Sequence, residues 1–206
     1  VAAAGDDLSE AAALALAVSS LPPHAVLVVG NSLPVRAIDL WAAPQPRPLQ
    51  VLSQRGVSGI DGLVSGTAGA HRAAARPTLV VLGDVSFVHD LTGLQALSAD
   101  GPPCVVLVLN NGGGRIFEQL PLATHTPAAM RHFVTPHAVR FDAAAAAFGV
   151  PYQRVTSVAA LGSALRSALA GSGACVVEAV VPPHGALEHA RQLAALADRV
   201  VAESIA

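Results

Sequence analysis

The sequence predicts a doubly wound α/β domain, in which a mainly parallel six-stranded sheet carries helices on both faces. Short apolar runs such as residues 78–82 and 104–109 show no polar alternation, which is typical of strands buried on both faces. Helical segments alternate with these runs, as in parallel sheets built from strand–helix–strand units. With 206 residues, 52% of them hydrophobic, we expect one domain over residues 1–206.

The apolar runs and turn residues give the order of the elements. The predicted strands cover residues 25–30, 50–53, 78–82, 104–109, 152–154 and 174–181. Helices are predicted over residues 7–21, from residue 34, and over 60–72, 87–98, 142–148, 158–170 and 185–205. Asp7-Leu8-Ser9-Glu10 is typical of a capping box, Pro22-Pro23 ends the first helix, and Asp142 is expected to cap a later one.

Composition excludes several classes of function. The chain has no lysine, since all 12 of its basic residues are arginines, so a P-loop and a Schiff-base or pyridoxal enzyme are excluded. A net charge of −2 without a basic block gives no electrostatic basis for binding nucleic acid. The apolar runs are far shorter than the roughly 20 residues that a transmembrane segment needs.

The cysteines and histidines suggest neither a disulfide framework nor a zinc site. Cys104 and Cys175 lie in separate valine-rich runs, so we expect reduced core residues and a cytoplasmic protein. The eight histidines form no HxxxH or HExxH pattern. The first residue is Val1 rather than Met, which suggests a processed or excised piece, and no secretory signal is expected.

Three strand ends carry polar residues in glycine-rich turns: Gly30-Asn31-Ser32, Gly83-Asp84-Val85-Ser86 and residues 110–114 (NNGGG). Each alone is more often an ordinary turn or helix cap. Together they place the Asp84 carboxylate and the Asn111 amide in loops that can lie side by side. Mg²⁺ takes such oxygen ligands and completes its octahedron from phosphates and water. The sequence therefore predicts a magnesium-bound diphosphate, with Ser86 and the following helix N-terminus as donors.

The spacing of these turns resembles a known cofactor motif. Gly83-Asp84, followed 25 residues later by Asn110-Asn111, is similar to the motif of thiamin-diphosphate enzymes. Four longer strings resemble the 2-succinyl-5-enolpyruvyl-6-hydroxy-3-cyclohexene-1-carboxylate synthase family of menaquinone biosynthesis: GNSLPVR (30–36), QRGVSGIDG (54–62), GDVSFVHDL (83–91) and NNGGGRIFEQLP (110–121). HFVTPH (132–137) also fits a later loop of that family. The likeness covers nearly the whole chain but only the family's C-terminal, diphosphate-binding domain, which implies the thiamin-diphosphate-binding fold.

The resemblance implies a cofactor-binding set made of Ile60, Gly83, Asp84, Val85, Ser86, Asn111 and Gly113. Asp84 and Asn111 would bind Mg²⁺, or Mn²⁺ in its place, through their side chains, and Gly113 would bind it through its carbonyl. Ser86 would touch the diphosphate. Ile60 would be an apolar wedge that holds thiamin diphosphate bent, although an isoleucine before a helix is by itself more often a core residue.

The same resemblance implies the candidate substrate-binding residues Ser32, Arg36, Arg55, Ile116, Phe117 and Leu120. In this family 2-oxoglutarate is decarboxylated and its succinyl unit is added to isochorismate, a transferase reaction. Both substrates carry carboxylates, which arginine recognises through paired hydrogen bonds. The three apolar residues would line the reacting carbons, but their spacing suits core packing equally well.

One part of the implied active site has no counterpart in the sequence. The family uses a glutamate of an N-terminal pyrimidine-binding domain on a neighbouring subunit of a homo-oligomer. None of the glutamates lies in a matching context: Glu10, Glu118, Glu178, Glu188 and Glu203. We therefore expect this chain to lack the N-terminal and central domains, to supply the magnesium–diphosphate half of the site, and to be inactive alone.

Two other interpretations stay open. The chain could belong to another thiamin-diphosphate 2-oxo-acid decarboxylase or carboligase, against which Ser32, Arg36 and Arg55 argue. It could also be a non-catalytic module of the same fold. Asp84, Asn111 and Ser86 argue against this interpretation, whereas Val1 and the missing glutamate favour it. A dinucleotide-binding domain is less well supported, because no GxGxxG follows the first predicted strand.

Overall fold

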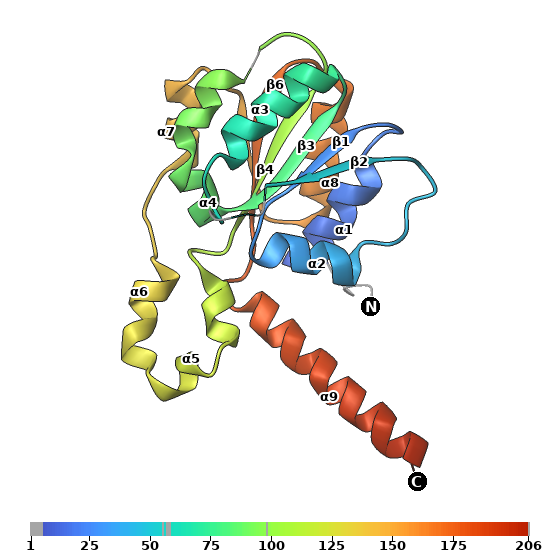
Figure 1. Ribbon diagram of the computed structural model, residues 1–206, viewed down its shortest axis with the longest axis vertical. Coiled ribbons are helices and arrows are strands. Elements are labelled where there is room, and N and C mark those ends of the chain that lie inside the picture. Colours follow the sequence, from blue (N-terminus) through green and yellow to red (C-terminus); the bar gives the residue numbers. More distant parts are fainter. Residues whose placement is uncertain (1–5, 55, 57–58, 98, 206) are drawn as a thin grey trace.

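The protein is built around a single parallel β-sheet, shown in Figure 1. The computed structural model describes residues 6–54, 56, 59–97 and 99–205. The six strands lie in the order β2-β1-β3-β4-β6-β5, and every neighbouring pair is parallel. Their bounds are β1 Val26–Val29, β2 Gln50–Ser53, β3 Thr78–Gly83, β4 Cys104–Asn110, β5 Tyr152–Val155 and β6 Ala174–Val180. The predicted fold class is confirmed.

Alternate residues of the central strands enter two separate hydrophobic cores. On one face, side chains such as Leu27, Val81 and Leu107 pack with α1 (Glu10–Ser20), α2 (Leu33–Trp41) and α8 (Val158–Ala170). On the other, Val28, Leu82 and Val106 pack with α3 (Leu63–Ala74), α4 (Asp84–His89), the 3₁₀ helix η1 (Leu91–Ala96) and α7 (Phe141–Ala147). Burial of both strand faces explains why these strands are continuously apolar.

Several predicted helix ends are wrong, and local contacts give the reasons. The N-cap of α1 is Ser9, whose hydroxyl accepts from the Ala12 amide at 3.2 Å, so Asp7 does not cap this helix. The third helix begins at Leu63 rather than at residue 60, directly after Gly62 with its positive φ of 67°. The N-cap position of α7 is Arg140, and Asp142 lies in its first turn.

The predicted helix over residues 87–98 is two shorter helices, and the first begins earlier than expected. α4 starts at Asp84, and Asp90 separates it from η1. The Asp90 carboxylate accepts from the Val64 and Ser65 amides at 2.7 and 2.8 Å, and also from the Ser65 hydroxyl. Asp90, from another segment, therefore satisfies N–H groups at the start of α3 that have no partner within the helix.

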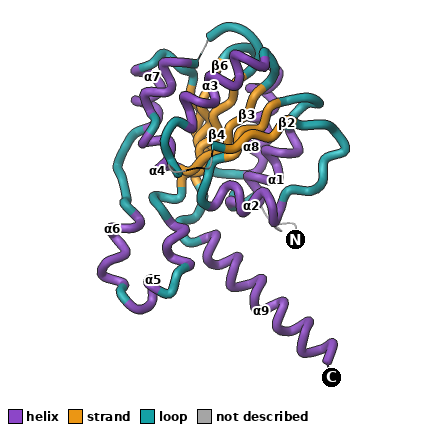
Figure 2. The backbone as a smooth tube through the Cα atoms, in the orientation of Figure 1, coloured by secondary structure: helices purple, strands orange, loops and turns teal. Residues whose placement is uncertain are grey.

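Three helices stand away from the sheet in Figures 1 and 2. α5 (Leu122–His125) and α6 (Met130–Val134) belong to the long connection after β4, and α9 (Gly185–Ile205) follows β6. A short 3₁₀ helix η2 (Arg115–Gln119) joins β4 to α5, and η3 (Pro127–Ala129) precedes α6. In the described part of the chain, no helix is both long and apolar enough to cross a membrane.

Candidate functional site

A cavity of about 630 Å³ opens at the carboxyl ends of β1, β3 and β4. In parallel sheets this edge is where ligands bind. The candidate residues from the sequence that line it are Ser32, Arg36, Ile60, Gly83, Asp84, Val85, Ser86, Asn111, Gly113, Ile116 and Phe117. Residues from separate strand ends thus meet around one space, as the sequence predicts.

Asp84 ties two of the strand-end loops together. It is the first residue of α4 and is only 2% exposed. Its Oδ1 accepts from the Val85 amide at 2.8 Å, and its Oδ2 accepts from the Gly113 amide at 2.7 Å. Burial raises the pKa of the Asp84 carboxyl above its usual 3.8, although these hydrogen bonds and His137 act in the opposite direction. His137 Nε2 lies 3.4 Å from Asp84 Oδ2.

Asn111 faces the same cavity from the end of β4. Its Nδ2 donates to Glu10 Oε1 at 2.7 Å, and both side chains are buried. Asn111 Oδ1 and Glu10 Oε2 are buried without a hydrogen-bond partner among the described residues. Burial raises the pKa of Glu10 above 4.5, the Asn111 hydrogen bond opposes this, and the charge of Asp84 adds to it.

These residues fit a magnesium ion. A buried carbonyl-type oxygen without a partner is costly, and a cation would satisfy Asn111 Oδ1. Asp84 supplies a carboxylate beside it, and the backbone of Gly113 is fixed by its bond to that carboxylate. Over the described residues there is no cluster of three or more His, Cys, Asp and Glu that could hold a metal. A site with one carboxylate and one amide suits a cation whose other ligands come from phosphates and water.

Gly113 is a position of this loop that other residue types cannot occupy without strain. Its φ is +134°, and a Cβ atom there would collide with the Val134 carbonyl oxygen. The neighbouring Gly114 amide donates to that same Val134 carbonyl at 2.7 Å. The loop after β4 is therefore packed directly against the end of α6, and small residues permit this close approach.

The loop after β1 contributes polar groups to the cavity from the opposite side. Ser32 has a φ of +71° and ψ of −130°, a backbone conformation that is rare outside glycine. Arg36, one turn into α2, is exposed and donates from Nη1 to the Ser32 carbonyl at 2.7 Å. Asn31 Nδ2 donates to the Gly59 carbonyl at 2.7 Å, which links this loop to the segment before α3.

Apolar side chains form another part of the cavity wall. Ile60, Ile116 and Phe117 line it and are half-buried. Phe117 also packs against Phe133 of α6, with ring centroids 5.6 Å apart. Leu120 is 48% exposed and is not part of the wall.

Arg55 lies outside the residues that the structure describes. The prediction that it faces the substrates therefore stays a prediction.

A buried polar network supports the loop after β4 from beneath. Glu178 of β6 is 6% exposed. It accepts from Asn110 Nδ2 at 2.7 Å and from the Tyr152 hydroxyl of β5. Asn110 Oδ1 in turn accepts from the Gly112 amide at 3.1 Å. The two consecutive asparagines thus have different roles, because Asn110 anchors the loop and Asn111 faces the cavity.

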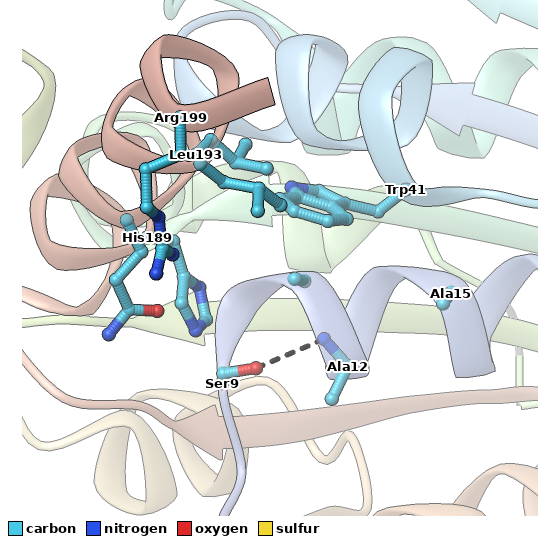
Figure 3. A pocket seen from close by; sticks show the side chains of 10 residues that line it. Ser9, Ala12, Ala15, Trp41, His189, Leu193 and Arg199 are labelled. Carbon is cyan, nitrogen blue, oxygen red and sulfur yellow. Dashed lines mark hydrogen bonds between the residues drawn. The ribbon is translucent and has the colours of Figure 1, made fainter. Parts of the chain in front are cut away.

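A second hollow, of about 460 Å³, lies between α1, α2 and α9 (Figure 3). Trp41 and Leu193 supply much of its wall, and the ring of His189 lies 6.2 Å from that of Trp41. Figure 3 also shows Ser9 capping the Ala12 amide at the start of α1. Asp84 and Asn111 do not line this hollow.

The sequence did not reveal every residue of the cavity. Glu10, Phe133 and Thr135 also line it, and His137 contacts Asp84. Phe133, Thr135 and His137 belong to the string HFVTPH, which resembles a later loop of the synthase family, so the sequence carried a signal for these three residues. Glu10 had no such signal, because it lies 101 residues from Asn111 and reads as an ordinary first-turn acid of a helix.

Comparison with known proteins identifies the class to which this fold and site belong. Residues 37–179 match the family described as thiamine pyrophosphate enzyme, C-terminal TPP binding domain. The chain belongs to this family.

Within that class, the similar curated proteins are 2-succinyl-5-enolpyruvyl-6-hydroxy-3-cyclohexene-1-carboxylate synthases. That of Sorangium cellulosum is 48% identical, over 92% of this chain and 32% of the relative. Those of Halobacterium salinarum and Yersinia enterocolitica are 38% and 42% identical, over 98% and 93% of this chain and 35% and 34% of the relatives. The chain spans about a third of the length of these relatives. The resemblance to the C-terminal domain of this synthase family is confirmed.

Solved structures support the fold independently. The benzoylformate decarboxylase of Polynucleobacter necessarius superposes with a TM-score of 0.68 at 20% identity, over 85% of this chain and 33% of that one. The thiamine diphosphate-dependent 4-hydroxybenzoylformate decarboxylase of Rhodococcus jostii RHA1 gives 0.68 at 21% identity, over 88% and 34%. At these identities the likeness shows the shared fold alone.

Proposed function

We propose that this chain supplies the magnesium–diphosphate half of a thiamin-diphosphate- and Mg²⁺-dependent transferase. The reaction would decarboxylate 2-oxoglutarate and add the succinyl unit to isochorismate. It would be a step of menaquinone biosynthesis and would take place in the cytoplasm. The observation that carries this proposal is the Asp84–Gly113 hydrogen bond beside the unpartnered Asn111 oxygen, in a chain similar to synthases of that reaction.

The metal is proposed from the donor set. Asp84 and Asn111 offer a carboxylate and an amide oxygen, and Gly113 offers its carbonyl, which leaves positions for phosphate oxygens. Ser86 lies on the first turn of α4, is 5% exposed and lines the cavity, which supports a role as a diphosphate donor. Gly83 and Val85 flank Asp84 there. Mn²⁺ would be accepted in the place of Mg²⁺, because it prefers similar oxygen ligands.

The substrates are proposed from the residues around the same cavity. Arg36 reaches its edge with a guanidinium that suits a carboxylate, and Ser32 offers a hydroxyl next to it. Ile116 and Phe117 offer an apolar surface for the carbon chain, and Ile60 offers one for the cofactor. Arg55 is proposed as a second carboxylate-binding residue on the basis of the resemblance alone.

The cofactor, this chain and a second protein domain would each have a separate role in the proposed reaction. Bound thiamin diphosphate supplies the electron sink for the charge that develops when carbon dioxide leaves. The residues of this chain bind the cation, orient the diphosphate and hold the substrate carboxylates. We propose that a pyrimidine-binding N-terminal domain of a neighbouring subunit, in a homo-oligomer, completes the site. The length of the relatives, about three times that of this chain, supports this arrangement.

The first test is a calorimetric titration of thiamin diphosphate with Mg²⁺, on wild type and Asp84→Ala, with and without the pyrimidine-binding domain. We expect magnesium-dependent binding that the variant loses.

Carbon dioxide release would then be measured with 2-oxoglutarate or pyruvate, in the presence of isochorismate. Turnover of 2-oxoglutarate only with both domains present supports the proposal. Turnover of pyruvate instead would point to another decarboxylase, and turnover by this chain alone would contradict the division into two halves.

A further inference from the structure

Glu10 stands out as a buried acid that the proposed chemistry does not use. It is the first residue of α1 and is 5% exposed, whereas helix N-terminal acids usually lie in solvent. Burying a carboxylate is costly unless hydrogen bonds replace the lost water. Its Oε1 accepts from Asn111 Nδ2 at 2.7 Å, and its Oε2 has no partner among the described residues.

The contact fixes which way the Asn111 amide points. An amide group has a donating and an accepting end, and a half-turn about its last bond exchanges them. A carboxylate only accepts, so Glu10 binds the NH₂ end. The accepting oxygen, Oδ1, is then left on the other side, buried and unpartnered. Without Glu10, the amide could equally present its NH₂ group to a cation, which would repel it.

We propose that Glu10 is a positioning residue that holds the Asn111 amide with its oxygen toward the bound cation. This inference rests on the proposed function, because it requires Asn111 to be a ligand. Residues that orient metal ligands through hydrogen bonds typically contribute about 10–100-fold to metal affinity. The described hydrogen bond of Glu10 goes from its Oε1 to the amide that would bind the cation, which is the contact that a positioning role needs.

A purely structural role for Glu10 makes different predictions. An acid in the first turn stabilises a helix through its macrodipole, and Glu188 likewise lies in the first turn of α9. Glu188 is exposed and does not line the candidate cavity. Its variants therefore control for the loss of a first-turn acid, and they leave Asn111 untouched.

The test uses three substitutions with opposite chemical consequences. Glu10→Gln keeps the reach and an accepting oxygen, but it loses the charge and gains a donating NH₂ group, so it can bind either end of the Asn111 amide. Glu10→Asp keeps the charge but is one methylene shorter, so its carboxylate retreats from Asn111. Glu10→Ala loses both. Positioning by a hydrogen bond predicts that the aspartate and alanine variants weaken cation binding most, and that the glutamine variant weakens it less, because glutamine can still bind the NH₂ end of Asn111 but no longer excludes the reversed amide.

The measurement is the dissociation constant of Mn²⁺ by electron paramagnetic resonance, with thiamin diphosphate present, on the complete polypeptide. We expect about a 10–100-fold increase for Glu10→Ala and Glu10→Asp, a smaller increase for Glu10→Gln, and none for Glu188→Ala. Should the alanine variant fail to fold, the glutamine and aspartate variants still distinguish a positioning role of Glu10 from a purely structural one. Unchanged binding in Glu10→Asp, or binding weakened in Glu10→Gln more than in Glu10→Asp, would overturn the inference. Wild type that binds no Mn²⁺ would overturn the proposed metal site and the inference together.

Discussion

The amide of Gly113 donates to Asp84 Oδ2 at 2.7 Å, across 29 residues of sequence. This bond joins the loop after β4 to the start of α4, which follows β3. β3 and β4 are neighbours in the sheet, so their ends are held in register by the ladder that pairs Gly83 with Leu109. The bond therefore couples the loop after β4 to the start of α4, the two segments that carry the candidate metal ligands. Its loss should change the position of both segments.

Gly113→Ala tests that coupling. A Cβ atom at this position would meet the Val134 carbonyl oxygen, and φ there is +134°. We expect a loss of about 1–3 kcal/mol in the free energy of unfolding and weaker binding of Mg²⁺ with thiamin diphosphate, because the loop must move away from Asp84. Urea denaturation and calorimetry measure the two effects.

Gly149→Ala is the matched control for that substitution. Gly149 also has a positive φ, +69°, but a Cβ atom there would have nothing within 4 Å. It should lower stability through backbone strain and leave cofactor binding unchanged. Equal cofactor binding in Gly113→Ala and wild type would show that the loop tolerates the displacement and that the coupling is unimportant.

Tyr152→Phe tests the support beneath the loop. It removes the hydroxyl that donates to the buried Glu178, which leaves part of a carboxylate without a partner. We expect a cost of about 1–3 kcal/mol in unfolding free energy. A double-mutant cycle with Glu178→Gln should give a coupling energy of about 0.5–3 kcal/mol. Additive effects of the two changes would contradict the network.

The ion-pair cluster around Glu118 predicts a pH dependence of stability. Burial alone would raise the pKa of Glu118, but hydrogen bonds from Arg115 Nη1 at 2.7 Å and from His184 Nδ1 at 2.9 Å outweigh it and lower the pKa below 4.5. A carboxyl with a lowered pKa stabilises the folded state above its unfolded value. This contribution should be fully present above pH 4.5 and lost as the pH falls through the folded pKa.

The measurement is the difference in melting temperature between wild type and Glu118→Gln, from pH 7 to pH 3. The difference should shrink at low pH, and for Glu188→Gln it should stay small throughout. Trp41, the single tryptophan, packs beside His189 of α9 and reports through its fluorescence whether this helix detaches. A difference that does not change with pH would show that the cluster does not contribute through charge.

Arg36→Ala tests the proposed recognition of substrate carboxylates. A hydrogen bond to a charged group contributes about 1.5–3 kcal/mol, so kcat/KM for 2-oxoglutarate should fall by about 10–150-fold. Binding of thiamin diphosphate with Mg²⁺ should not change, because Arg36 lies on α2 and is not one of the proposed metal ligands. Arg191→Ala, on the exposed surface of α9, is the control. An unchanged kcat/KM in Arg36→Ala would remove this residue from the substrate site.

The sequence alone was sufficient for the sheet and for most of the cavity. Strands such as β3 and β4 are continuously apolar because both of their faces are covered, and this pattern is visible without a structure. The position of polar residues after those strands was equally informative, because parallel strands end at one edge. Asp84, Asn111 and Ser32 therefore meet in the cavity as expected.

Only the tertiary structure decided which side chains from distant segments form hydrogen bonds with one another. Asp90 ends α4 because it caps α3, and Glu10 reaches Asn111 because α1 packs beside the end of β4. Neither contact leaves a local pattern, since a single hydrogen bond between segments 26 or 101 residues apart imposes no periodicity on the chain. Repeating hydrophobic patterns determine the sheet and its helices, whereas single long-range contacts depend on packing that exists only once the chain has folded.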